Sequence, residues 1–84
     1  VGFGTIVNAG AIVNHDCVLG ELVHVAPGAV LSGGVHVGAR TTIGPNASVH
    51  IGVRIGDDAL IAMGAVVKAD VPDGGHVQAG AVWG

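Results

Sequence analysis

The sequence predicts an all-β chain that coils into a triangular prism of stacked parallel strands. Three observations carry this prediction. Counted from Val1, the first position of each six-residue unit is Val, Leu or Ile in twelve of fourteen units. The fifth position is Thr, Ala, Cys or Val in thirteen of them. Glycines recur every eighteen residues, which is three units. A period this strict indicates a repeat architecture.

Each unit is expected to contribute one short strand and then turn a corner. A period of six is not that of a helix, and a Val-rich, Gly-punctuated composition favours strands. The first and fifth positions point inward, and successive coils stack at about 4.8 Å. Gly and Asn tolerate positive φ and therefore mark corners. Two columns qualify: Gly2, Gly20, Gly38, Gly56 and Gly74, and Gly10, Gly28, Asn46 and Gly64.

The regular phase weakens after Lys68. If the count of six continues, Asp73 and Ala79 take first positions, and Trp83 takes a fifth position that is small in every other unit. An indole does not fit inside so narrow a prism. The last unit is therefore expected to leave the stack or to cap it, and the turn signature at 71–74 lies at the same place.

Composition restricts the class of protein. The 84 residues make one domain, 1–84, whose core is thin because only Phe3 and Trp83 are aromatic. A solenoid suits this size, since each repeat buries its apolar side against its neighbours. No apolar run reaches the roughly 18 residues of a membrane span. Three basic and six acidic residues argue against a nucleic-acid or anionic-membrane partner. The single Cys17 fits a cytoplasmic protein and, at an inward position, a small core filler rather than a nucleophile.

The outward positions predict faces with different roles. The units 7–12, 25–30, 43–48 and 61–66 are expected to form an apolar face. Its outward residues are Ile12, Ala26, Pro27, Val30, Pro45, Ser48, Ala62, Met63 and Val66. Apolar side chains aligned on one face indicate a partner surface. We expect the row of Ile12, Val30 and Val66 to contact further copies of the chain.

A second face, made by 13–18, 31–36, 49–54 and 67–72, is expected to carry the chemistry. Its polar residues are Asn14, His15, Asp16, His36, His50, Arg54, Lys68 and Asp70. His15 is a candidate general base, and a neighbouring Asp16 would fix its tautomer if a corner brings the two side chains together. One coil further, Gly33 and Gly34 leave a trough of bare backbone. Such a trough suits an extended, amide-bearing ligand such as the pantetheine arm of coenzyme A.

The chain resembles the hexapeptide-repeat, left-handed β-helix superfamily over essentially its whole length. Segments 7–20, 23–29, 31–35, 61–67 and 70–72 are similar to one branch of it, the acetyltransferases that act on sialic acid and on nucleotide-linked amino sugars. The discriminating run is Asn8…His15-Asp16-Cys17…His24. The resemblance implies a single-stranded, left-handed parallel β-helix of about 4.7 coils, with eighteen residues in each coil.

The resemblance also implies a site. His15 would be the general base and Asp16 the acid that assists it, Asn8 and His24 would line the same site, and Gly33 with Gly34 would receive acetyl-CoA. The acceptor would be a sugar or nucleotide sugar, its amine or hydroxyl left open, and the domain would form a homotrimer with the site between neighbouring prisms. Family members carry an N-terminal Rossmann-like domain, which we expect this chain to lack. They also tend to end in Gly-Asn-Pro-Ala, where this chain has Gly80-Ala81-Val82-Trp83.

Two alternative functions are a zinc enzyme and an inactive scaffold. Carbonic anhydrases with the same prism bind zinc through three His, two of them five residues apart, and that spacing is absent here. We therefore expect no metal site and treat His36, His50 and His76 as surface residues. Arg54, one coil from His36, either meets a phosphate or is a solvated charge. The second alternative is that the chain is an excised or engineered solenoid scaffold without catalytic activity.

Overall fold

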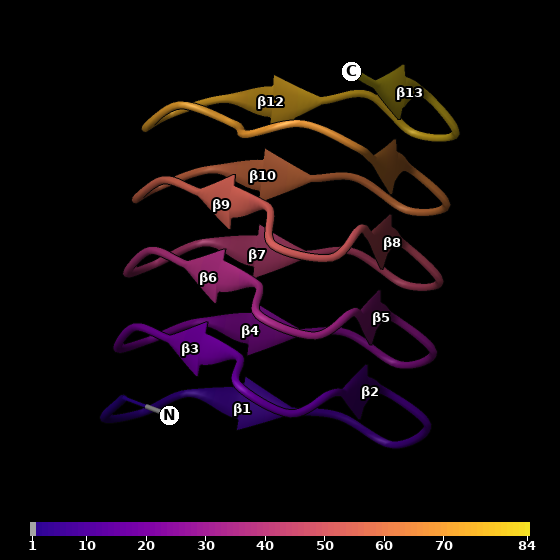
Figure 1. Cartoon of the computed structure of the whole chain (residues 1–84). Helices are drawn as coiled ribbons and strands as arrows, with labels where there is room; N and C mark the ends of the chain where they lie inside the picture. The colour runs from indigo at the N-terminus through magenta and orange to yellow at the C-terminus, as the bar shows by residue number, and fades with distance from the viewer. Residues whose placement is uncertain (1) are drawn as a thin grey trace.

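The computed structural model describes residues 2–84 as one stack of coils built from thirteen two-residue strands (Figure 1). The strands are β1 Ile6–Val7, β2 Ile12–Val13, β3 Val18–Leu19, β4 His24–Val25, β5 Val30–Leu31, β6 His36–Val37, β7 Thr42–Ile43, β8 Ser48–Val49, β9 Arg54–Ile55, β10 Leu60–Ile61, β11 Val66–Val67, β12 His76–Val77 and β13 Val82–Trp83. Val1 lies outside the described residues. Within 2–84 there is no helix, and so none that is long and apolar enough to cross a membrane.

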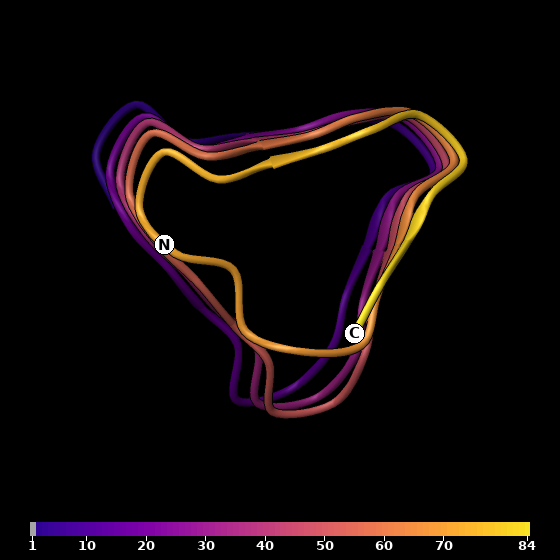
Figure 2. The same cartoon turned by 90° about the horizontal axis from the view of Figure 1, so that it is seen from above.

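The strands form three parallel sheets, one on each side of a triangle (Figure 2). Sheet A contains β1, β4, β7, β10 and β12; sheet B contains β2, β5, β8, β11 and β13; sheet C contains β3, β6 and β9. Partners in the first four coils are eighteen residues apart, as in the pairs Ile6–His24 and His36–Arg54. Seen from above, the chain runs clockwise as it rises toward the viewer, so the coil is left-handed. The predicted fold is confirmed.

The corners lie at the fourth position of each unit, and not after the sixth position as the sequence analysis assumed. Positive φ occurs there in glycines such as Gly10 and Gly34 and in five non-glycine residues. The five are Asp16, Leu22, Arg40, Asn46 and Asp58, with φ of 61°, 57°, 59°, 60° and 54°. The column that starts with Gly10 is thus confirmed as a column of corners.

The other glycine column was interpreted wrongly, except at Gly74, which does have positive φ. Gly20, Gly38 and Gly56 lie before the corner, where the backbone of the next coil passes very close. A Cβ on Gly20 would lie 2.9 Å from the backbone nitrogen of Ala39. These positions require glycine because adjacent coils leave no room for a side chain.

The last coil is two residues shorter than the others, and this corrects the predicted phase. Val71 pairs with Ile55 and Val77 with Ile61, and both separations are sixteen residues. First positions therefore belong to Val71, Val77 and Trp83, and not to Asp73 and Ala79. Val71 and Val77 are buried, so the shorter coil returns aliphatic side chains to the core.

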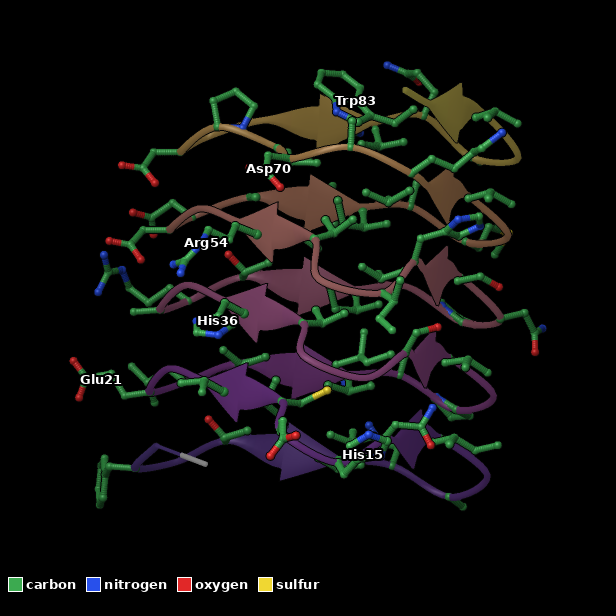
Figure 3. All side chains as sticks on the ribbon, viewed as in Figure 1. His15, Glu21, His36, Arg54, Asp70 and Trp83 are labelled. Carbon is green, nitrogen blue, oxygen red and sulfur yellow. The ribbon has the colours of Figure 1, made fainter. Side chains whose placement is uncertain are left out.

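Trp83 caps the prism and does not leave the stack. It pairs with Val67 in sheet B, and its half-buried indole packs against the core. Its Nε1–H donates a hydrogen bond to the carbonyl oxygen of Asp70 at 3.0 Å. The indole thus closes the end of the prism beside the shortened corner (Figure 3).

The core is a single column of small and branched side chains from the first and fifth positions. Leu31, Ile43 and Ile61 have no exposed surface. Thr41 is buried and fully used: its hydroxyl donates to the Gly56 carbonyl at 2.6 Å and accepts from the Ala59 N–H at 3.1 Å. Half-buried Cys17 packs against the core and donates to the Ser32 carbonyl, as expected of an inward filler.

Because the corners lie inside the units, the residues of each predicted face are distributed over two sheets. Ile12, Val30, Ser48 and Val66 do share sheet B, but Ala26 and Ala62 follow strands of sheet A, and Ala26 is buried. On the predicted polar face, His36 and Arg54 lie in sheet C, whereas His50 follows a strand of sheet B. A face therefore combines the end of one unit with the start of the next.

Candidate functional site

His15 lies at the corner between sheets B and C in the lowest coil (Figure 3). The corner arises because Asp16 takes a positive φ of 61°. The imidazole lies against Gly33 of the next coil up, where an added Cβ would be 3.4 Å from its Nε2 atom. The Gly34 N–H donates to the His15 carbonyl at 3.1 Å. The structure thus brings together three of the predicted residues, His15, Gly33 and Gly34.

Above His15 the same corner carries few side chains: Gly33, Gly34 and Gly52 have none, whereas the side chain of Ile51 is exposed. Gly34 and Gly52 both have φ of 72°, and a Cβ on Gly52 would meet nothing within 4 Å. Within residues 2–84 the N–H groups of Gly33 and Ile51 donate no hydrogen bond. They leave a row of backbone donors along the corner, open to a ligand.

At the corner between sheets C and A, two of the equivalent backbone N–H groups are already hydrogen-bonded. There the Ala39 N–H donates to Asp57 Oδ1 and the Asp57 N–H to Asp73 Oδ1, both at 2.8 Å. Carboxylates thus cap the equivalent donors on that corner. The sequence contains this contrast, Asp against Gly or Ile at third positions, but the sequence analysis did not use it.

Asp16 is not brought into contact with His15 as the sequence analysis envisaged. No hydrogen bond joins the Asp16 carboxylate to the imidazole within the described chain. Both residues are exposed on the corner, and the positive φ of Asp16 is what forms it.

Asn8 and His24 meet on sheet A. The side-chain nitrogen Nδ2 of Asn8 lies 2.6 Å from Nε2 of His24 and 3.2 Å from the carbonyl oxygen of Val25. In the triangle of Figure 2 their face is one whole side away from the His15 corner, with sheet B between them. One copy of the chain therefore holds two separate clusters, His15 with its glycines and Asn8 with His24.

Sheet C contains a shallow groove of about 610 Å³. The absence of side chains at Gly20, Gly38 and Gly56 hollows it, and His36 and Arg54 line it one above the other (Figure 3). The groove also contains three carboxylates, from Asp57, Asp70 and Asp73. Asp70 accepts the Arg54 backbone N–H at 2.9 Å, in place of the strand carbonyl that the shortened coil lacks.

One ion pair is formed away from these clusters. Arg40 forms a two-pronged ion pair with Asp58 at 2.8 and 3.1 Å on the corner between sheets C and A. This hydrogen bonding raises the pKa of Arg40 and lowers the pKa of Asp58. No group of three or more His, Cys, Asp or Glu that could hold a metal ion occurs among residues 2–84.

Known proteins share this fold. The family model of the hexapeptide repeat of succinyl-transferase matches residues 34–69. The acetyltransferase domain of PglB from Neisseria gonorrhoeae FA1090 is 41% identical with a TM-score of 0.86 in each of two structures, one of them in complex with acetyl coenzyme A. In its repeat and its fold the chain resembles the hexapeptide-repeat acyltransferases.

A third structure is a histidine-to-asparagine mutant of perosamine N-acetyltransferase from Caulobacter crescentus, in complex with CoA and GDP-perosamine. It is 45% identical to this hexapeptide-repeat chain, with a TM-score of 0.86. Each of the three structures matches 87% of the chain, which in turn covers only 36% of the PglB domain and 35% of the perosamine enzyme. The hexapeptide-repeat chain thus spans about a third of the length of these proteins.

Proposed function

We propose that the chain is the catalytic β-helix of an acetyl-CoA-dependent sugar N-acetyltransferase that acts on a nucleotide-linked amino sugar. The observation that carries the proposal is the arrangement at the corner: an exposed imidazole lies against Gly33, at the foot of a row of unused backbone donors. The likeness to a protein bound to CoA and GDP-perosamine supports the choice of donor and acceptor class.

In this proposal His15 is the general base. The neutral imidazole takes a proton from the acceptor amine as the amine nitrogen attacks the thioester carbonyl of acetyl-CoA. The carbonyl oxygen gains negative charge, and the Gly33 N–H, which donates no hydrogen bond within residues 2–84, would donate to that oxygen. The C–S bond then breaks, and the proton on His15 is available to the leaving thiolate. Asp16 would assist through its negative charge on the same corner.

The donor would extend upward from His15 along the corner. Its pantetheine amides would pair with the open backbone donors, including the Ile51 N–H. At the upper end, Lys68 follows sheet B and Arg54 lies in sheet C, and neither forms an ion pair within residues 2–84. Both cations therefore remain free to approach the phosphates of coenzyme A.

The two clusters would form one site only between neighbouring copies. Asn8 and His24 on sheet A cannot reach His15 of the same copy across sheet B. We propose a cytoplasmic homotrimer in which the sheet A cluster of one copy faces the His15 corner of the next. The apolar row of Ile12, Val30 and Val66 on sheet B, with Ile12 half-exposed, would pack in the interface.

The direct test is binding and turnover. The chain, or the longer protein that contains it, should bind acetyl-CoA in calorimetry and acetylate a nucleotide-linked amino sugar. Gly33→Val should weaken acetyl-CoA binding at least tenfold, because its methyl groups would fill the trough against the His15 ring. If the wild-type trimer does not bind acetyl-CoA, the proposal fails and the inactive scaffold is the better account.

A further inference from the structure

The contact between Asn8 and His24 determines where the imidazole carries its proton. One atom, Asn8 Nδ2, lies within hydrogen-bonding distance of both His24 Nε2, at 2.6 Å, and the Val25 carbonyl oxygen, at 3.2 Å. An amide group offers a nitrogen with two protons and an oxygen with none, so its orientation decides which partner must accept.

The Val25 carbonyl fixes the orientation of the amide. This oxygen can only accept, and it already receives the backbone N–H of Asn8 at 2.9 Å. With the amide flipped, Asn8 Oδ1 would face another oxygen with no proton between them. The nitrogen therefore lies on this side and donates one proton to the Val25 carbonyl and the other to His24 Nε2.

Because Nε2 accepts, it carries a lone pair, and in the neutral imidazole the proton is on Nδ1. We infer that Asn8 fixes His24 as the Nδ1–H tautomer, so that sheet A presents a fixed N–H donor and not a base. A free histidine in water prefers the opposite tautomer. Asn8 is thus a positioning residue that acts through His24.

The consequence for the reaction rests on the proposed function. Two histidines would meet in the composite site, and only His15 would have a nitrogen lone pair open to the acceptor amine. His24 would donate its Nδ1–H to a substrate oxygen and remove no proton. The two imidazoles would therefore have separate roles that their residue type alone does not distinguish.

The tautomer is measurable on the chain itself. In a long-range proton–nitrogen NMR spectrum of the ¹⁵N-labelled protein above neutral pH, His24 should show a protonated Nδ1 and a bare Nε2. In Asn8→Ala the proton should move to Nε2. His76 occupies the equivalent outward position of sheet A in β12 and should not change between the two samples, which makes it the matched control. A protonated Nε2 in the wild type, or no change in Asn8→Ala, overturns the inference.

A second experiment tests whether His24 acts as a hydrogen-bond donor or as a base. The side-chain nitrogen of Asn can occupy the position of a histidine Nδ1, so His24→Asn keeps a donor there while His24→Ala removes it. His24→Asn should retain at least tenfold more kcat than His24→Ala. Equal losses would overturn the donor role. The NMR result does not depend on catalysis, so failure of the proposed function would leave the tautomer assignment standing.

Discussion

At the scale of single residues, His15 is distinguished by what surrounds it and not by its type. The chain has five histidines, and only His15 lies against a bare glycine beside unused backbone donors. His36, one coil up and past the corner, lies in the sheet C groove among carboxylates. Its position therefore makes His15 the candidate base, which the composition alone does not distinguish from the other histidines.

The first prediction follows from this difference. His15→Ala should lower kcat for acetyl transfer by about 10²–10⁴-fold, the usual contribution of a general base, and leave acetyl-CoA affinity nearly unchanged. His36→Ala, the matched control, should leave kcat within about twofold. Steady-state kinetics combined with calorimetry checks both. Similar losses in the two variants would mean that the fold, and not base catalysis, is being perturbed.

For these residues the six-residue repeat predicts the position in the coil but not the side-chain contacts. Spacing predicted that Gly33 and Gly34 lie one coil above His15, because eighteen residues return the chain to the same corner. It did not predict the lack of contact between Asp16 and the imidazole, which depends on side-chain torsions. Positive φ at Leu22 and Arg40 was equally out of reach, since neither residue type favours it.

At the scale of elements, each two-residue strand has one side chain inside the prism and one outside. In β10, Ile61 has no exposed surface, whereas its neighbour Leu60 is 41% exposed. From β3 to β12 the inward residues of the strands belong to the single hydrophobic core cluster.

This pair gives the second prediction. Ile61→Ala should lower the free energy of unfolding by roughly 2–5 kcal/mol, since it leaves a cavity in a packed column. Leu60→Ala should cost less than about 1 kcal/mol, because its side chain is already hydrated in the monomer. Denaturant titration of the two variants measures both. Equal costs would show that the inward and outward positions are misassigned.

The third prediction concerns the short last coil. Trp83→Ala should cost about 1–3 kcal/mol, because it uncovers the end of the core and removes the hydrogen bond to the Asp70 carbonyl. Val82→Ala, its outward neighbour in β13, should cost less than about 0.5 kcal/mol. Urea unfolding followed by circular dichroism compares them. An unchanged midpoint for Trp83→Ala would mean that the indole does not cap the prism.

The sequence alone failed at this coil for a physical reason. A strict count of six assumes that every corner is present, and one corner is shortened between Val67 and Val71. Val71, Val77 and Trp83 still recur every six residues, so a phase shift of two after Val67 restores the pattern. This shifted period is visible in the sequence, and it arises because the first position points into the core and must be apolar.

At the scale of the whole molecule, the division of the site into two clusters is the main feature. Sheet B lies between them and carries the apolar row of Ile12, Val30 and Val66. The fourth prediction is that Ile12→Asp or Val30→Asp converts the proposed trimer into monomers, because a carboxylate cannot be buried there without a partner. Light scattering that still shows a trimer for both variants would exclude this face as the interface.

The central claim, a site shared between copies, is tested most directly by mixing two inactive variants. His15→Ala keeps the sheet A cluster, and His24→Ala keeps the base. If each site takes His15 from one copy and His24 from the next, subunit exchange in an equal mixture should restore about one quarter of the sites of a symmetric ring. Acetyl-transfer activity near a quarter of wild type after exchange is the predicted result. Activity no higher than the mean of the two separate variants, with exchange verified by mass spectrometry, would contradict it.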